Sequence, residues 1–185
     1  MNTERLLVAL TLPVPVRDSL IALAEPLPGV AWTRPDQLHV TLRFLGDVSA
    51  AMSESMIARL GAVQVAPFIL PLEGMGTFPP NRPPRVIWIG IGSGHPRLFQ
   101  LRQRLDDALL AAGLQLDVRT FHPHVTLARC TESAAPAISH WMHVHRNITP
   151  PPFRVEAFDL YASELKTTGA VHTLKQRFPL EDSAP

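Results

Sequence analysis

The chain has 185 residues, of which 46% are hydrophobic, and this is enough to bury a core as one domain or as two small lobes. Its formal net charge of +1 excludes the strong basic field that tight, nonspecific binding of a nucleic-acid duplex requires. Cys130 is the only cysteine, which excludes an intramolecular disulfide and fits a reducing compartment. The N-terminal apolar run is short and ends at Pro13, so we expect neither a membrane span nor a signal peptide and predict a soluble, cytoplasmic protein.

Hydrophobic periodicity and turn residues predict a mixture of strands and helices. In chain order we expect a strand at 5–12, a helix at 16–24, a strand at 38–44, a helix at 49–60, strands at 68–72 and 85–91, a helix at 96–112, a strand at 123–129, and strands at 153–162 and 171–178. Ser49 is a candidate N-cap for the second helix, and Gly113 suits the end of the third. The glycines and prolines of residues 74–84 predict a loop, and residues 167–169 predict a turn.

One sequence word occurs twice, as LHVTLRF at 38–44 and as PHVTLAR at 123–129. The two histidines, His39 and His124, lie 85 residues apart, which is close to half the chain. This spacing suggests a duplicated lobe, although the flanking sequences match too weakly to establish a duplication. Since no low-complexity segment or long linker divides the halves, we expect residues 1–185 to form one bilobed domain.

Strand geometry places the histidine and the threonine of each repeated motif on the same face. Successive side chains point to opposite faces of a strand, so His39 shares a face with Thr41, and His124 shares a face with Thr126. Two facing lobes would then present two pairs of imidazole and hydroxyl groups across one groove. A phosphodiester needs a base for its nucleophile, an acid for its leaving oxygen and donors for its nonbridging oxygens. The two pairs supply all of these near neutral pH.

The chain resembles the 2H phosphoesterase superfamily, and within it the RNA 2′,3′-cyclic phosphodiesterases, also called 2′-5′ RNA ligase-like proteins. The resemblance rests on both His-x-Thr motifs and on segments that follow the family's order: RLLVALTLP, LHVTLRFLGDV, PPRVIWIG, FHPHVTLAR, FDLYASEL and HTLKQRFPL. It implies a bilobed α+β fold, with two antiparallel sheets related by pseudo-twofold symmetry, helices on the outside and a central active-site groove. It also implies hydrolysis of RNA 2′,3′-cyclic phosphate ends to a 2′-phosphate, and a reversible 2′-5′ joining reaction that uses no nucleotide cofactor; we expect no cofactor.

The resemblance assigns roles to four residues of this sequence. His39 and His124 are the expected acid and base, and Thr41 and Thr126 are expected to hold the phosphate. By analogy with the family, His124 activates water and His39 protonates the departing 3′ oxygen. The symmetry of the two motifs leaves this direction open.

Arg129, at the end of the second motif, resembles a phosphate-binding position of the family, and we expect it to bind substrate. Strand parity puts residues 124, 126 and 128 on one face and Arg129 on the other, unless the strand bulges or ends there. Arg43 has the parity of His39 and Thr41 but a weaker resemblance. We therefore interpret Arg43 as a solvated or structural residue.

Three other features have alternative interpretations. His122 lies two residues before the second motif histidine, and we interpret it as a rim or structural residue. Trp88 is interpreted as a core residue rather than a base-stacking platform. His140, His143 and His145 could bind a metal ion, but their spacing matches no known signature and favours an exposed helix or turn. Because two imidazoles and two hydroxyls already fill the roles of the reaction, we expect no metal site.

Two alternative functions remain open. The same site could act as a 2′-5′ RNA ligase, joining a 2′,3′-cyclic phosphate end to a 5′-hydroxyl end. The groove could also bind an RNA end without chemistry, although two intact histidine and threonine pairs argue against a noncatalytic module. The expected partner is RNA with a 2′,3′-cyclic phosphate end or a small cyclic nucleotide. We expect a monomer that does not bind membranes.

Overall fold

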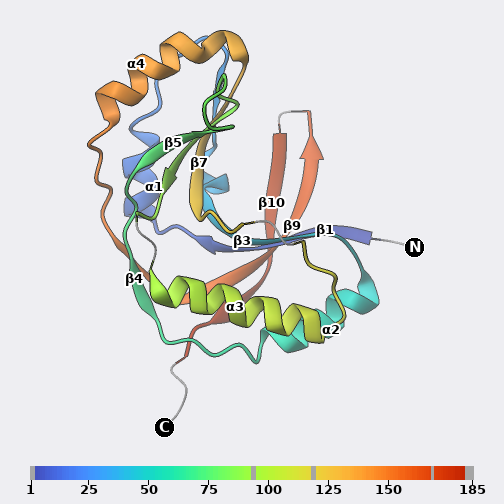
Figure 1. Cartoon of the computed structure of the whole chain (residues 1–185). Helices are drawn as coiled ribbons and strands as arrows, with labels where there is room; N and C mark the ends of the chain where they lie inside the picture. The colour runs from blue at the N-terminus through green and yellow to red at the C-terminus, as the bar shows by residue number, and fades with distance from the viewer. Residues whose placement is uncertain (1–2, 93–94, 118–119, 168, 182–185) are drawn as a thin grey trace.

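A computed structural model of the chain describes residues 3–92, 95–117, 120–167 and 169–181. Its helices are α1 (Val14–Ile21), α2 (Ala50–Leu60), α3 (Pro96–Ala111) and α4 (Ala135–His145), with short 3-10 turns η1 (Pro35–Gln37) and η2 (Glu132–Ala134). Its strands are β1 (Thr3–Thr11), β2 (Val30–Trp32), β3 (His39–Ser49), β4 (Phe68–Leu70), β5 (Met75–Phe78), β6 (Val86–Gly90), β7 (His124–Cys130), β8 (Phe153–Val155), β9 (Ala157–Lys166) and β10 (Gly169–Pro179). This arrangement confirms the expected α+β class (Figure 1).

The described strands form two antiparallel sheets, and the larger sheet has two halves. Its order is β10-β9-β1-β3-β7-β6-β5, with β2 also pairing with β7, while β4 and β8 form a small second sheet. The halves meet between the motif strands β3 and β7, where Val40 pairs with Val125. These valines are equivalent residues of the two HVTL words, so their antiparallel pairing relates the two motif strands by a local twofold axis. The two halves of the larger sheet are therefore joined at this residue pair.

Helices cover the face of the sheet opposite the motif histidines. The expected leucine face of the third helix is confirmed, because Leu98, Leu101, Leu105 and Leu109 of α3 are fully buried. Ser49 caps α2 as predicted, since its hydroxyl accepts a hydrogen bond of 3.4 Å from the Met52 amide. Helices α2 and α3 lie together below β1 and β3, whereas α4 lies at the other end of the molecule (Figure 1). None of the helices in the described ranges is long and apolar enough to cross a membrane.

The predicted loop at 74–84 is wrong in its first part, which forms β5. Gly76 of this strand pairs with Trp88 of β6, and a Cβ atom built on Gly76 would lie 2.1 Å from the indole ring. This glycine therefore makes room for a large neighbour instead of forming a turn. The predicted strand at 153–162 is divided into β8 and β9, and the short β2 was not predicted. The predicted turn at 167–169 includes residue 168, which lies outside the described residues.

Candidate active site

Both motif strands carry a β-bulge at the same residue of the repeated word. In β3, Arg43 pairs with Val8 and Thr41 with Ala9, which leaves Leu42 as the extra residue. In β7, Ala128 pairs with Ile87 and Thr126 with Trp88, which leaves Leu127 as the extra residue. The bulge shifts the alternation of side chains by one residue. The two strands consequently share one burial pattern over their first seven residues.

The bulge reverses the expected parity of the two arginines. Arg129, which simple alternation directed away from the motif histidine, is exposed on the same face as His124 and Thr126. Phe44 takes the equivalent place in β3 and is 69% exposed. The second motif therefore ends in the cation Arg129, whereas the first motif has the aromatic ring of Phe44 at the equivalent position.

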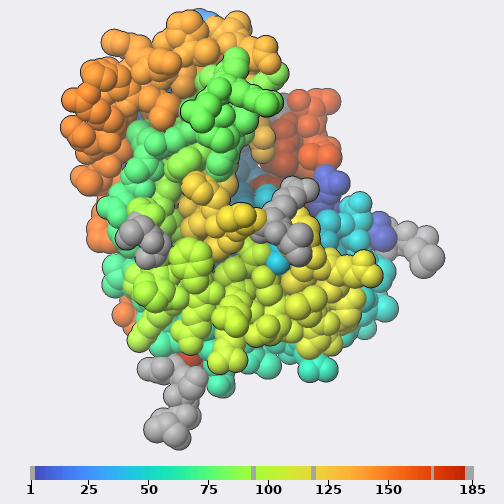
Figure 2. Space-filling view, in the orientation of Figure 1, coloured from blue at the N-terminus to red at the C-terminus, as the bar shows by residue number. Residues whose placement is uncertain are grey.

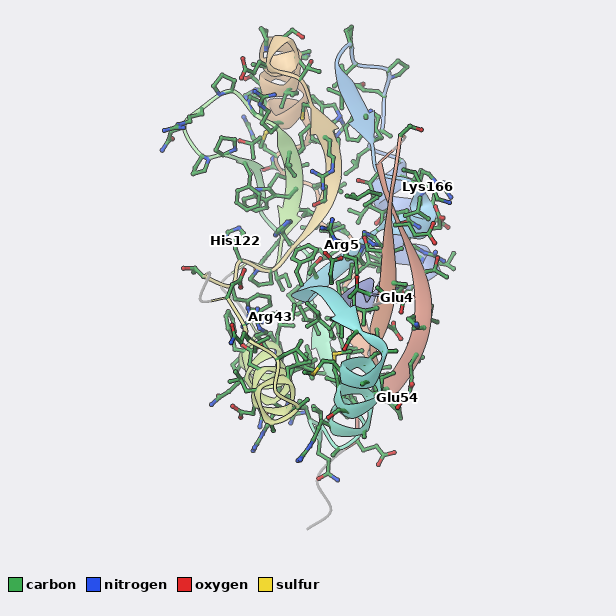
Figure 3. All side chains as sticks on the ribbon, turned by 90° about the vertical axis from the view of Figure 1, so that its right-hand side faces the viewer. Glu4, Arg5, Arg43, Glu54, His122 and Lys166 are labelled. Atoms are coloured by element: carbon green, nitrogen blue, oxygen red, sulfur yellow. The ribbon has the colours of Figure 1, made fainter. Side chains whose placement is uncertain are left out.

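Arg43 is a structural residue, as interpreted, but its predicted face is wrong. Its side chain is 8% exposed and lies behind the strand, where its guanidinium makes two 2.9 Å hydrogen bonds to the Asp106 carboxylate of α3. It also donates to Asp117, at 2.8 Å to the carboxylate and 2.9 Å to the carbonyl. Arg102, which shares Asp106, donates to the carbonyl of the bulge residue Leu42 at 2.7 Å. Figure 3 shows Arg43 beside α3. This cluster holds the bulge of β3 against the helix.

The two motif histidines are held in the same way. His39 Nδ1 lies 2.7 Å from the carbonyl oxygen of Gln37, and His124 Nδ1 lies 2.6 Å from that of His122. Because a carbonyl only accepts hydrogen bonds, each Nδ1 carries the proton and each neutral ring keeps the lone pair on Nε2. His39 Nε2 lies 3.0 Å from the hydroxyl of Thr41, which therefore donates to it. Both imidazoles are oriented so that Nε2 can exchange a proton.

The junction of β3 and β7 brings the two pairs together. Val40 and Val125 point into the core, so the histidine and threonine on either side of each valine point to the opposite face. The register between β3 and β7 in the described ranges is this one pair, and His124 is close enough to His39 for its charge to lower the pKa of His39. The surface is hollowed between the half that contains β5 and β7 and the β9–β10 hairpin (Figure 2). The valine pair therefore puts both motifs on one face of the sheet, while the joint action of the four residues stays a prediction.

Burial lowers the pKa of both histidines. The pKa of His39 falls to about 4, chiefly because the ring is removed from water, and the charges of His172 and His124 lower it further against the opposing effect of the Gln37 carbonyl. Burial also lowers the pKa of His124, with a smaller contribution from the charge of His122. Both rings are therefore uncharged in the empty groove at neutral pH.

The lowered pKa of His39 predicts a stability that depends on pH. The unfolded chain takes up the His39 proton near pH 6.5, whereas the folded protein takes it up only near pH 4, so acidification through this window favours unfolding. We expect this group to contribute about 2 to 3 kcal/mol to the fall in unfolding free energy between pH 7 and pH 4. Urea unfolding of the wild type and of His39→Gln at several pH values measures the difference. If the unfolding free energies of the two proteins depended on pH in the same way, the lowered pKa of His39 would be contradicted.

Aromatic side chains surround His124 on its own half of the sheet. The rings of Phe78 and Trp88 lie 5.1 Å and 6.0 Å from that of His124, measured between centroids, and His122 stands edge-on to both. Trp88 is the cross-strand neighbour of Thr126 and is only partly buried. The interpretation of Trp88 as a core residue is therefore wrong, because β6 turns only Ile87 and Ile89 into the core. His122 lies at the rim, as interpreted, and contributes its carbonyl to the site (Figure 3).

A hydrogen-bonded chain supports the His39 side of the site. Thr11, the cross-strand neighbour of His39, donates to the Asp159 carboxylate at 2.5 Å and is also hydrogen-bonded to the hydroxyl of Tyr161. Asp159 is completely buried, and burial raises its pKa, although Arg177 lies 3.6 Å from it. Since Thr11 gives its proton to Asp159, the Tyr161 hydroxyl donates to Thr11. This chain holds the Tyr161 ring beside His39, with centroids 6.4 Å apart.

The sequence did not predict two further residues of the site, Gln37 and His172. His172 of β10 places its ring edge-on to His39, with centroids 4.9 Å apart. Gln37 occupies the same position before His39 that His122 occupies before His124, so the spacing of the repeat could have identified it. Nothing in the local pattern of β10 indicates that His172 reaches the motif.

The histidines of HWMHVH lie on α4 and do not converge. His143 is hydrogen-bonded to Arg146 at 3.1 Å, and the His145 ring packs against buried Trp141 with centroids 4.8 Å apart. Across the described ranges, no group of three or more histidine, cysteine, aspartate or glutamate side chains is arranged to hold a metal ion. The segment predicted as an exposed helix or turn is thus the helix α4, which buries Ile138 and Trp141 on one side.

Comparisons with known proteins agree with the fold and the motifs. The model of the 2′-5′ RNA ligase superfamily matches residues 18–167. The chain is 31% identical to the RNA 2′,3′-cyclic phosphodiesterase of Escherichia coli over 96% of this chain and 97% of that protein. It is 36% identical to the protein of that name from Aeropyrum pernix over 114 residues, which span 62% of this chain and 63% of that protein. The crystal structure of E. coli LigT in its apo form superposes with a TM-score of 0.78 and 28% identity, covering 97% of this chain and 99% of that one. The chain with the two bulged His-Val-Thr-Leu strands therefore belongs to the 2′-5′ RNA ligase superfamily.

Proposed function

We propose that this protein is an RNA 2′,3′-cyclic phosphodiesterase that opens a terminal cyclic phosphate to a 2′-phosphate. The observation that carries the proposal is the pairing of Val40 with Val125, which puts two equivalent histidine and threonine pairs on one face of the sheet. The matched Nδ1 contacts of His39 and His124, which make Nε2 the proton-accepting atom of each ring, add to it. The names of the bacterial and archaeal relatives support the same activity.

In the proposed reaction, water attacks the phosphorus atom while Nε2 of one histidine takes a proton from the water. The bond between phosphorus and the 3′ oxygen breaks, and the other histidine gives its Nε2 proton to that oxygen. The oxygen of the water stays on the new 2′-phosphate, and the two histidines have exchanged protonation states. Family analogy makes His124 the base and His39 the acid. A bound phosphate anion raises the pKa of a nearby histidine, which allows the acid to become charged when substrate binds.

The threonines and Arg129 are the proposed phosphate contacts. Thr41 donates to His39 in the empty site, and a bound phosphate would take this proton instead, leaving His39 Nε2 directed at the reacting oxygens. Thr126 supplies the equivalent hydroxyl beside His124. Arg129 lies on the same face beyond the bulge, where a guanidinium can pair with phosphate oxygens. Donors aimed at nonbridging oxygens stabilise the charge that these oxygens hold in the transition state.

The aromatic rings beside His124 support RNA as the substrate class. Phe78 and Trp88 present partly exposed rings next to the proposed water-activating histidine. Stacking of a base on an aromatic side chain stabilises a single-stranded nucleic acid by about 1 to 3 kcal/mol and tolerates any base. These rings are therefore the proposed contact for the base of the terminal nucleotide. Recognition of an RNA end through such local contacts agrees with the small net charge of +1.

The products formed from a defined RNA test the proposal. The protein would be incubated with an oligoribonucleotide that ends in a 2′,3′-cyclic phosphate, together with a second oligoribonucleotide bearing a 5′-hydroxyl, in EDTA and without ATP. We expect a linear 2′-phosphate as the main product. A joined strand as the main product would favour the ligase function of the same site. Unchanged RNA, or activity that EDTA removes, would contradict the proposed function.

We further propose that residues 1–185 act as a single bilobed domain, since both halves contribute to one site and to one hydrophobic core. A monomer in a reducing cytoplasm remains a prediction from the sequence.

A further inference from the structure

His172 reaches the motif from the far edge of its half of the sheet. The order of this half is β10-β9-β1-β3, so two strands separate His172 of β10 from His39 of β3. The β9–β10 hairpin stands upright across the line of β1 and β3 (Figure 1). The His172 and His39 rings meet nearly at right angles, with planes at 88° and centroids 4.9 Å apart. The hairpin therefore brings a third histidine into contact with a motif histidine.

Gln37 fastens this contact through three hydrogen bonds. The His172 amide donates to the side-chain oxygen of Gln37 at 2.6 Å, and the Gln37 amide nitrogen donates to the His172 carbonyl at 3.4 Å. The main-chain carbonyl of Gln37 accepts the Nδ1 proton of His39. Gln37 is only 9% exposed, although it is polar. Gln37 thus holds the main chain of His172 with its side chain, and it holds the ring of His39 with its own main-chain carbonyl.

The charged groups around the two rings favour an uncharged His172. Burial lowers the pKa of His172, and the Arg129 guanidinium lowers it further. The other titratable groups that face the pair are His124 from β7 and Tyr161 from β9. His172 Nδ1 is buried and has no hydrogen-bond partner among the described residues. A buried lone pair without a partner costs less than a buried N–H without one, which assigns the proton to Nε2.

We propose that His172 is a positioning residue for His39: its ring forms a wall against His39 and keeps that ring in the orientation set by the Gln37 carbonyl. An uncharged wall also lets His39 accept the proton that it must pass to the leaving oxygen, whereas a charged His172 would oppose this. The proposal deepens the proposed function, because it assigns a role within the same site.

Steady-state kinetics on a 2′,3′-cyclic phosphate oligoribonucleotide test the wall. In His172→Ala we expect kcat to fall about tenfold and KM to change less than about twofold, because the loss concerns a reacting group more than substrate binding. His172→Phe restores an aromatic wall and should recover most of kcat. His140→Ala, which removes an exposed histidine of α4, is the matched control. Wild-type kinetics in His172→Ala, no recovery in His172→Phe, or an effect confined to KM would each overturn the proposal.

The Gln37 side chain provides an independent test. Gln37→Leu removes both hydrogen bonds to His172 but keeps the main-chain carbonyl that holds His39. If the Gln37 side chain acts only by placing the His172 ring, its loss adds nothing once that ring is removed. The Gln37→Leu/His172→Ala double variant should therefore lose no more kcat than the worse single variant. Gln64→Leu, at an exposed position, is the control. Losses that multiply in the double variant would show that the two residues act separately and would overturn the proposal.

An NMR titration of the His39 ring separates this proposal from the function itself. Burial is the main cause of the lowered pKa of His39, so the pKa should rise in His172→Ala, which uncovers the ring, and stay low in His172→Phe, which keeps it covered. An unchanged titration in His172→Ala would overturn the His172 proposal whatever the enzyme does. A wild-type protein without cyclic phosphodiesterase activity would instead contradict the proposed function, while the titration would still report on the contact.

Discussion

Alanine in place of His39 or His124 is expected to lower turnover of a 2′,3′-cyclic phosphate end by about 10²- to 10⁴-fold. Each variant keeps the strand that carries the motif, because the neighbouring valine and leucine, not the histidine, pack into the core. Each loses the Nε2 atom that the carbonyl of Gln37 or His122 orients toward the groove. Single-turnover rates, with circular dichroism to confirm folding, measure the effect.

The double variant should be little worse than either single variant, because the acid and the base act in one transition state. His140→Ala is the control for the loss of a histidine, since this residue is exposed on α4. A folded His39→Ala or His124→Ala protein that retains most of the activity would contradict the assignment.

Replacement of Arg43 by methionine is expected to lower the free energy of unfolding by about 1 to 3 kcal/mol, because it removes hydrogen bonds between charged groups. Methionine keeps much of the length of the side chain, and Arg102 still pairs with Asp106, but Asp106 loses its two hydrogen bonds from Arg43 and Asp117 loses two more. The same change loosens the bulge of β3, so turnover should fall as well. Urea denaturation gives the stability, and the initial rate gives the second effect.

Arg154→Met is the matched control, because Arg154 pairs with Glu156 while both side chains are more than half exposed. Exposed pairs of this kind contribute only about 0.2 to 1 kcal/mol. If Arg43→Met lost no more stability than Arg154→Met, the Arg43 cluster would not hold the strand as described.

The sequence predicted the elements whose patterns are local. Leu98, Leu101, Leu105 and Leu109 recur on one face of a helix, and this spacing requires no knowledge of the rest of the fold. In the two HVTL motifs, likewise, side chains alternate between the two faces of the strand as far as the threonine, as the sequence alone predicts. Beyond that point, a bulge changes which face each side chain takes, and a bulge is a property of the register between two strands. The face of Arg43 could therefore not be read from its own strand.

Contacts between distant segments explain the other differences. Gly76 indicates a turn when its neighbours in sequence are considered, but it faces the indole of Trp88 across two strands. His172 lies 133 residues after His39, and only the course of the β9–β10 hairpin and the side chain of Gln37 bring the two rings together. The repeat could identify the four motif residues, whereas their supporting residues depend on the packed fold.

The most direct test of the account is the fate of labelled water in the reaction. The wild-type protein would open an oligoribonucleotide 2′,3′-cyclic phosphate in ¹⁸O-water with EDTA present, and phosphorus NMR would identify the product. Water activated by one histidine while the other protonates the 3′ oxygen predicts a 2′-phosphate that carries a single ¹⁸O atom. A 3′-phosphate product, or no product until a metal ion is added, would contradict the two-histidine account.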